Sequence, residues 1–168
     1  MIKKKIKQPL ISPTWQFICQ HPAYFLAFGF GSGLSKWAPG TMGSLMAIPL
    51  YGLLLLFLSP MLIFLVAIVM FFLGAWAAEK TSCKLGLQDY SGIVIDEIVA
   101  MWMILAIAPQ TWIGVAVSFI LFRIIDILKP WPIHWFDQHV TGGLGVMLDD
   151  IIAAAFVMLT FFIWKTIS

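Results

Sequence analysis

Residues 42–78 read MGSLMAIPLYGLLLLFLSPMLIFLVAIVMFFLGAWAA, and no side chain in this stretch is charged. Ser59-Pro60 divides it into an uncharged run of 17 residues, Met42–Leu58, and a second of 18 residues, Met61–Ala78. As helices the two runs would be about 26 and 27 Å long, close to the ~30 Å hydrocarbon core of a bilayer. Because proline does not continue a helix comfortably, the Ser-Pro link predicts an antiparallel helical hairpin.

The composition of the whole chain agrees with a membrane-embedded protein. Of its 168 residues, 61% are apolar and only 11% are charged, whereas soluble domains have roughly 45–50% apolar and ~25% charged residues. A water-soluble fold could not hide so much apolar surface. The same numbers exclude a disordered chain, a disulfide scaffold and a basic nucleic-acid binder. We therefore expect one membrane-embedded domain over residues 1–168, with no nucleic-acid partner.

The stretch after residue 92 can be interpreted in two ways. Ile98–Phe122 contains no charge and could form a single span. Pro109-Gln110 offers a turn near its middle, which would instead give two short helices, Ile93–Ala108 and Thr111–Leu128. We prefer the two helices, because they bring the charged ends of both segments to the same side of the membrane. Residues 79–92 before them are expected to form a polar loop.

Gly145–Trp164 is the last predicted span, and Pro22–Leu34 is too short to cross, so that an interfacial or re-entrant helix is expected there. The predicted fold is therefore all-α: a polytopic membrane helical bundle of about five short spans plus this N-terminal helix. The basic segment 1–21 should stay in the cytoplasm, because Lys3, Lys4, Lys5 and Lys7 lie in it. This predicted membrane topology places all eight acidic residues, and every basic residue except Lys165, on the cytoplasmic side.

The charged residues near the span ends are the candidates for chemistry. Six lie at a similar shallow depth: Asp96, Glu97, Arg123, Asp126, Asp149 and Asp150. The i,i+3 spacing of Asp126 from both Arg123 and Lys129 predicts helix-surface salt bridges. Five carboxylates still face one arginine and one nearby lysine, so they must protonate, bind a metal or stay solvated. Hard oxygen ligands favour Mg²⁺ or Mn²⁺, and a metal site is the interpretation that we prefer.

A second group of residues suits an anion. Residues 38–44, APGTMGS, lead into the first span, with Thr41 as the expected N-cap and Ser44 three residues later. Gly40 and Gly43 would let a ligand approach the backbone N–H groups of the helix N-terminus. Gly142-Gly143-Leu144-Gly145 repeats the pattern before the last span. Together with Arg123 and Lys129, these segments indicate a phosphate held beside a carboxylate-bound metal.

Four segments in order are similar to those of one known family. They are GFGSGLSKWAPGTMGS at 29–44, IVIDE at 93–97, FRIIDILKPWPIHWF at 122–136 and GGLGVMLDDIIA at 142–153. Over nearly its whole length the chain resembles the bacterial phosphatidylglycerophosphatase A family. The resemblance implies Mg²⁺-dependent removal of the terminal phosphate of phosphatidylglycerophosphate, a phospholipid substrate, to give phosphatidylglycerol and phosphate. It also implies a multi-pass protein of the bacterial inner membrane with its active site facing the cytoplasm.

The roles expected on this basis divide the charged residues into two sets. Asp96, Glu97, Asp149 and Asp150 would bind Mg²⁺ directly or through water. Arg123 and Lys129 would neutralise the phosphate, with contributions from Thr41, Ser44 and the backbone at Gly40 and Gly43. Asp126 would complete the metal site or orient Arg123. One of these five carboxylates would act as general base on water or as a nucleophile; we prefer metal-activated water.

A small ion- or proton-coupled transporter is the alternative from another functional class. Such a protein should carry ionisable residues through the full depth of the bilayer. Here the distal halves of the predicted spans are apolar. The sequence leaves the number of chains in the assembly open.

Overall fold

The structure is a computed structural model that describes residues 9–87 and 90–167. Within these ranges every regular element is helical, as predicted. The helices are α1 (Trp15–Ile18), α2 (Pro22–Ala27), the 3₁₀ helix η1 (Gly29–Leu34), α3 (Pro39–Leu55), α4 (Pro60–Leu85), α5 (Ile95–Ile107), α6 (Trp112–Leu128), α7 (Ile133–His139) and α8 (Gly142–Ile167). Lys3, Lys4, Lys5 and Lys7 of the basic segment, and Asp89, lie outside the described residues.

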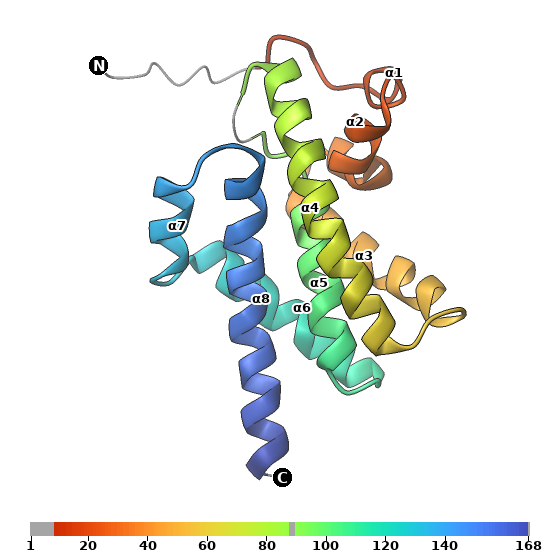
Figure 1. The fold of residues 1–168 in the computed structure, drawn as a ribbon, viewed down its shortest axis with the longest axis vertical. Helices are drawn as coiled ribbons and strands as arrows, with labels where there is room; N and C mark the ends of the chain where they lie inside the picture. The colour runs from red at the N-terminus through yellow and green to blue at the C-terminus, as the bar shows by residue number, and fades with distance from the viewer. Residues whose placement is uncertain (1–8, 88–89, 168) are drawn as a thin grey trace.

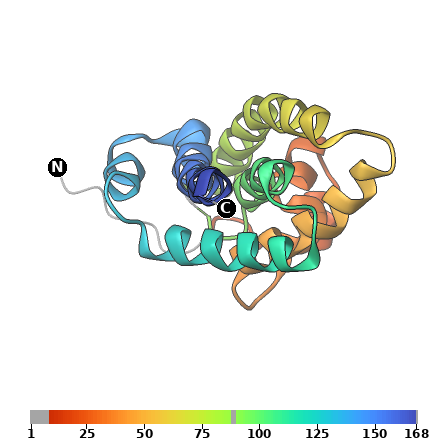
Figure 2. The same cartoon turned by 90° about the horizontal axis from the view of Figure 1, so that it is seen from below.

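Three helices form the centre of the molecule. The long helices α4 and α8 pack against each other and against α5 (Figure 1). Nearly every residue of α5 is buried, which explains why its sequence is apolar on all sides. Seen along the long axis, α6 lies across one side of α5 and α8 (Figure 2). The carboxylates of the first turn of α5 therefore lie inside the bundle.

The preferred two-helix interpretation of residues 93–128 is confirmed. Helix α5 ends at Ile107, and the amide of Gln110 donates to the carbonyls of Leu105 and Ala108 at 2.7 and 2.9 Å. Thr111 then caps α6 by accepting a hydrogen bond from the N–H of Gly114 at 3.0 Å. Side chains thus satisfy the backbone groups that Pro109 leaves open, and the chain reverses.

Two other local predictions need correction. The polar loop expected from residue 79 begins only at Gly86, because Glu79, Lys80 and Lys84 continue α4 as good helix formers. Gly86, with φ of +69°, ends the helix. The N-terminal helix expected over Pro22–Leu34 is divided into α2 and η1, because Gly29, directly after the C-cap Phe28, has a left-handed φ of 53°. A further kink lies within η1, where Phe30 and Gly31 have φ values of 58° and 102°.

Only part of the predicted set of five spans is supported by helix length and composition. Within the described residues, Pro60–Leu85 and Gly142–Thr166 are long and apolar enough to cross a membrane. At 26 residues, α4 would be about 39 Å long. Helices α3, α5 and α6 have 17, 13 and 17 residues, or about 20–26 Å. For these three helices the crossing remains a prediction.

Candidate active site

A polar cavity of about 1110 Å³ opens where the first turn of α5, the last turns of α6 and the N-terminal parts of α3 and α8 meet. Most of the charged residues singled out from the sequence line it. They are Asp96, Glu97, Arg123, Asp126, Lys129, Asp149 and Asp150, together with Gly40. Thr41, Gly43 and Ser44 are not among the lining residues. The cavity therefore unites the predicted metal ligands with the two predicted phosphate-binding cations.

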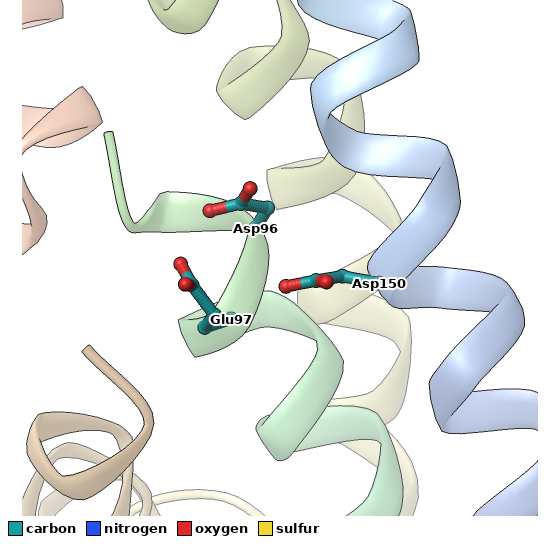
Figure 3. Close-up of side chains that lie close together, drawn as sticks. All are labelled: Asp96, Glu97 and Asp150. Carbon is teal, nitrogen blue, oxygen red and sulfur yellow. The ribbon is translucent and has the colours of Figure 1, made fainter. Parts of the chain in front are cut away.

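Three carboxylates converge in the cavity from two helices. Asp96 and Glu97 lie in the first turn of α5, and Asp150 reaches them from α8 (Figure 3). One oxygen from each of the three lies within 4.8 Å of the others. Asp96 and Asp150 are 8% and 3% exposed. Like charges this close in a buried site need a proton or a cation between them.

Several buried oxygens in this group lack a partner among the described residues. They are Asp96 Oδ1, Glu97 Oε2, Asp149 Oδ1 and Asp150 Oδ2. An unpaired buried carboxylate oxygen is costly. A hard divalent cation such as Mg²⁺ would satisfy these atoms, because oxygen is the ligand that it prefers. The residues present therefore fit the metal that the sequence predicts.

Asp149 has a different environment from its neighbour Asp150. Its Oδ2 accepts a hydrogen bond from Lys129 Nζ at 2.5 Å, and the same ammonium contacts Asp137 Oδ1 at 2.8 Å. Burial lowers the pKa of Lys129, but the carboxylates of Asp137 and Asp149 outweigh it and hold this pKa above its ordinary value. Lys129 therefore stays protonated at neutral pH.

The predicted salt bridge between Asp126 and Lys129 was wrong. Lys129 is the C-cap of α6 and has left-handed backbone angles, with φ of 42°. This conformation takes its side chain off the helix surface on which an i,i+3 pair would form. Lys129 instead connects α6 to α7 and α8 through Asp137 and Asp149.

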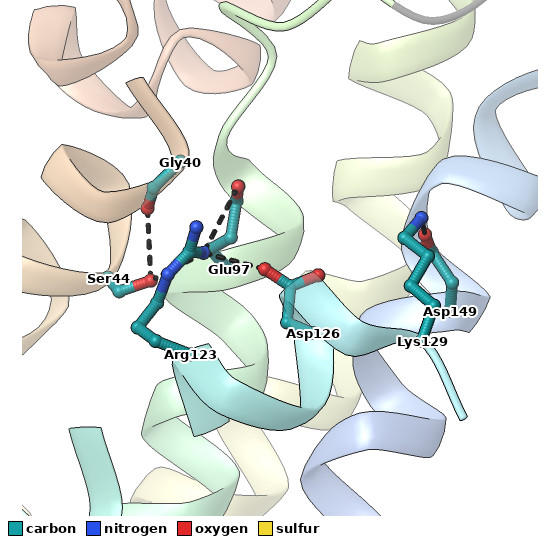
Figure 4. A network of polar contacts seen from close by, with 7 residues as sticks. All are labelled: Gly40, Ser44, Glu97, Arg123, Asp126, Lys129 and Asp149. Carbon is teal, nitrogen blue, oxygen red and sulfur yellow. Dashed lines mark hydrogen bonds and ion pairs between the residues drawn. The ribbon is translucent and has the colours of Figure 1, made fainter. Parts of the chain in front are cut away.

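Arg123 forms the second polar network of the cavity (Figure 4). Its Nη1 lies 2.7 Å from Asp126 Oδ2, which confirms that predicted pair, and 3.9 Å from Glu97 Oε1. Nη1 also donates to Ser44 Oγ at 3.4 Å. Arg123 Nε is buried and has no partner among the described residues. The guanidinium is thus fixed on one side and keeps a free donor on another.

The start of α3 differs from the prediction in its capping. The helix begins at Pro39, and the N-cap is Ala38, with φ of 40° and no side-chain cap. Thr41 therefore lies within the first turn, and its assignment as N-cap was wrong. Proline is favoured at the first helical position because its fixed φ suits the helix and its missing N–H is not needed there. Ser44 donates to the carbonyl of Gly40 at 3.0 Å and accepts from Arg123.

Gly40 and Gly43 of this segment make room for different neighbours. A Cβ on Gly40 would lie 2.2 Å from Glu97 Oε1. Any larger residue at this position would therefore displace the Glu97 carboxylate. A Cβ on Gly43 would lie 2.7 Å from the Cβ of Val94. Gly43 therefore allows α3 to pack against the chain before α5, away from the cavity lining.

Sequence reasoning missed two acidic residues of this region. Asp137 was not paired with Lys129, although it follows Lys129 by only eight residues and lies in α7, the next helix. Glu79 was placed in a loop, but its Oε2 accepts from the N–H of Gly143 at 2.6 Å and so caps the start of α8 from α4. The Gly142-Gly143 pair was a signal for such a close approach, because a Cβ on Gly143 would lie 2.0 Å from the carbonyl oxygen of Ala75.

Comparisons with known proteins agree on one family. The family model described as phosphatidylglycerophosphatase A matches residues 25–165. The protein of that name from Escherichia coli (strain K12) is 46% identical over 134 residues, covering 79% of this chain and 77% of the relative. The one from Haemophilus influenzae is 42% identical over 153 residues, covering 90% and 93%.

A third relative carries a different substrate in its name. It is a Bacteroides thetaiotaomicron protein with the provisional name phosphatidylinositol-3-phosphatase, and it is 40% identical over 137 residues, covering 76% of this chain and 84% of its own. All three names describe phosphatases of phospholipid headgroups. No solved structure matches the chain.

Proposed function

Because the chain belongs to the phosphatidylglycerophosphatase A family, we propose that it hydrolyses the terminal phosphomonoester of phosphatidylglycerophosphate. The products are phosphatidylglycerol and inorganic phosphate. The reaction is Mg²⁺-dependent and takes place at the cytoplasmic face of the bacterial inner membrane. One observation carries the proposal: a single cavity contains three clustered carboxylates and two basic side chains. The carboxylates belong to Asp96, Glu97 and Asp150, and the basic side chains to Arg123 and Lys129.

The cavity contains positively charged side chains and hydrogen-bond donors that suit a phosphate group. A phosphomonoester brings two negative charges, and Arg123 and Lys129 line the cavity that it enters. Arg123 Nε has a free donor, and a guanidinium binds phosphate oxygens through several such donors at once. The N–H of Gly40 lies in the first turn of α3, where the backbone N–H groups lack helical partners and favour an anion.

Asp96, Glu97 and Asp150 would hold the metal, with Asp149 beside them. When bound, Mg²⁺ supplies Lewis-acid stabilisation of phosphate charge and lowers the pKa of a water molecule. Asp126 holds Arg123 in place through its 2.7 Å contact. One carboxylate of the cluster takes the proton of the attacking water as general base. The alternative to this route is attack by a carboxylate to form an acyl-phosphate.

The apolar helices match a lipid substrate. Many of the exposed side chains of α4 and α8 are large and hydrophobic, among them Phe72 and Phe162, each 64% exposed. We propose that these faces contact the acyl region of a bilayer and that the chain crosses it several times. The headgroup alone then needs to enter the polar cavity, while the acyl chains remain in the membrane.

Phosphate release from purified protein tests the activity. Phosphatidylglycerophosphate in mixed micelles should release phosphate with Mg²⁺ and none with EDTA. Asp96→Asn and Glu97→Gln should each reduce kcat by at least about 100-fold, because both remove a metal ligand. Phosphatidylinositol 3-phosphate serves as the comparison substrate and should be the poorer one. Unchanged activity in both variants would contradict the proposed site.

The transporter alternative is not favoured. Between Asp150 and Lys165, α8 carries no charged side chain, and α4 carries none before Glu79. An ion path through the bilayer would need polar groups along these lengths. Reconstituted vesicles should therefore show no cation flux above that of empty vesicles, and a saturable flux would revive this alternative.

A further inference from the structure

One carboxylate oxygen in the cavity, Oδ1 of Asp149, belongs neither to the carboxylate cluster nor to an ion pair. The residues whose oxygens lie within 4.8 Å of one another are Asp96, Glu97 and Asp150, and Asp149 is not among them. Asp149 nevertheless lines the same cavity and is only 8% exposed. Its Oδ1 is buried and has no hydrogen-bond partner among the described residues. A buried acceptor in this state needs a partner, and a ligand in the cavity can supply one.

The other oxygen of Asp149 is already paired. Lys129 Nζ donates to Oδ2 at 2.5 Å (Figure 4), and it also donates to Asp137 Oδ1 at 2.8 Å. In this ion pair Asp149 is a carboxylate, which can only accept hydrogen bonds. Because Lys129 holds Oδ2, the direction of Oδ1 is fixed as well. Oδ1 is therefore a preorganised acceptor for an N–H or O–H group of a ligand.

The substrate of the proposed function has one group of that kind. Its acyl esters and its two ionised phosphates contain only acceptors, whereas the glycerol of its headgroup carries a free hydroxyl. This hydroxyl lies on the carbon next to the one that bears the terminal phosphate. Asp149 has a corresponding place in the chain, because it directly precedes Asp150 of the cluster in α8, and consecutive Cα atoms are about 3.8 Å apart. A phosphate held at the cluster would therefore bring the hydroxyl toward Asp149.

We propose that Asp149 Oδ1 accepts a hydrogen bond from the headgroup hydroxyl and so makes the site selective for phosphomonoesters with a hydroxyl on the neighbouring carbon. This inference rests on the proposed function, since it takes phosphatidylglycerophosphate as the substrate. The hydroxyl would satisfy Oδ1 in place of the cation that the sequence predicts for Asp149. A substrate without the hydroxyl would leave this buried acceptor unpaired, and the cost of the unpaired oxygen is what rejects it.

An analogue with 1,3-propanediol in place of the headgroup glycerol tests the proposal. It differs from phosphatidylglycerophosphate only in lacking the hydroxyl. Phosphate release by the full chain in mixed micelles with Mg²⁺ gives kcat/KM for both lipids. We expect the wild type to prefer the hydroxylated lipid by roughly 10–100-fold, the effect of a hydrogen bond to a charged group. A ratio near one would overturn the hydroxyl subsite.

Asp149→Ala locates the preference. It removes the acceptor and should lower the ratio of the two kcat/KM values to below about 3, because no buried oxygen is then left unpaired by the analogue. Asp137→Asn is the matched control, because Asp137 also pairs with Lys129 but is not proposed to contact the hydroxyl. It should keep the wild-type ratio, whatever its effect on the rate itself.

Circular dichroism establishes that each variant keeps its helices. If Asp149→Ala does not fold, Asp149→Asn takes its place, because it keeps the size of the side chain. Its amide is neutral, and hydrogen bonds to neutral groups are weaker than those to charged groups. Asp149→Asn should therefore lower the ratio several-fold, and an unchanged ratio in this variant would overturn the subsite.

The outcomes separate the inference from the proposed function. Equal hydrolysis of both lipids by the wild type overturns the subsite and leaves a phosphatase. No phosphate release from either lipid overturns both. Equal losses on the two lipids in Asp149→Ala, with the ratio unchanged, overturn the subsite and assign Asp149 to the metal or to the fold. A wild-type preference that Asp149→Ala abolishes and Asp137→Asn keeps supports it.

Discussion

At Gly40, the absence of a side chain controls the geometry of two charged groups. A Cβ there would lie 2.2 Å from Glu97 Oε1 and 3.4 Å from Arg123 Nη1. Gly40→Ala should therefore push both groups aside and lower kcat/KM by about 10–100-fold, since small misplacements of catalytic groups have effects of this size. Steady-state kinetics with phosphatidylglycerophosphate measure the change.

Gly52→Ala is the matched control for this variant. Gly52 lies in the same helix, and a Cβ there would meet nothing within 4 Å. We expect unchanged kinetics and a stability gain of up to about 1 kcal/mol from the better helix propensity of alanine. Equal losses of activity in both variants would show that α3 responds to any added methyl group, and not to the crowding at Glu97.

Arg123 is predicted to act through its shape as well as its charge. Its Nη1 contacts Asp126 and Ser44, which leaves Nε for a ligand. Arg123→Lys keeps the positive charge but replaces the planar fork with a single ammonium. We expect kcat/KM to fall roughly 100-fold, the cost of removing one well-placed donor to a developing negative charge. A variant with full activity would mean that the charge of Arg123 alone is sufficient.

The contact between α4 and α8 decides where Asp149 and Asp150 lie. Glu79 of α4 accepts from the N–H of Gly143, and a Cβ on Gly143 would lie 2.0 Å from the carbonyl oxygen of Ala75. Backbone atoms cannot yield as a flexible side chain can, so Gly143→Ala should shift the start of α8 away from α4. Asp149 and Asp150, two turns further along, would move with it.

We therefore expect Gly143→Ala to lower both activity and stability, the latter by about 1–3 kcal/mol, as overpacking typically does. Glu79→Gln keeps a carbonyl oxygen for the same hydrogen bond and should have a smaller effect. Unfolding in mild detergent, followed by circular dichroism, gives the stability. Thr160→Ala, at an exposed site in the distal half of α8, serves as control. Wild-type stability in Gly143→Ala would contradict a close fit of the two helices.

The ends of α4 provide a test of how the whole molecule lies in the membrane. Phe57, just before α4, is 80% exposed, and Cys83, near its end, is an exposed free cysteine. The helix between them would be about 35 Å long. In a Cys19→Ser background, a membrane-impermeant maleimide should label native Cys83 only from the cytoplasmic side. In a Cys19→Ser, Cys83→Ser background, Phe57→Cys should react only from the periplasmic side. Labelling of both positions from one side would contradict a membrane-crossing α4.

At the scale of the whole molecule, local sequence signals predicted the helices well. Pro109 and Thr111 are adjacent to the break between α5 and α6, and their effects on backbone hydrogen bonding depend only on neighbouring residues. The end of α4 was misplaced because Glu79 and Lys80 look like loop residues when hydropathy alone is considered. Their helix propensity continues the helix to Leu85.

The identity of the candidate site residues also followed from the sequence. Charged side chains are expensive in an apolar helix, so their presence at the ends of predicted spans marked Asp96, Glu97 and Arg123 without any knowledge of the fold. The resemblance to one family rested on the same segments. The family, and with it the phosphatase activity of the curated relatives, could thus be predicted from those segments and not from composition alone.

Only the tertiary structure decided which of these groups meet. Asp150 joins Asp96 and Glu97 because α8 packs closely on α4 and α5, a contact that depends on the glycines at its start. Lys129 pairs with Asp149 and Asp137 instead of Asp126, because a left-handed residue ends α6. Helical spacing describes neighbours along one helix, whereas these contacts depend on how separate helices are tilted and joined, which no local pattern contains.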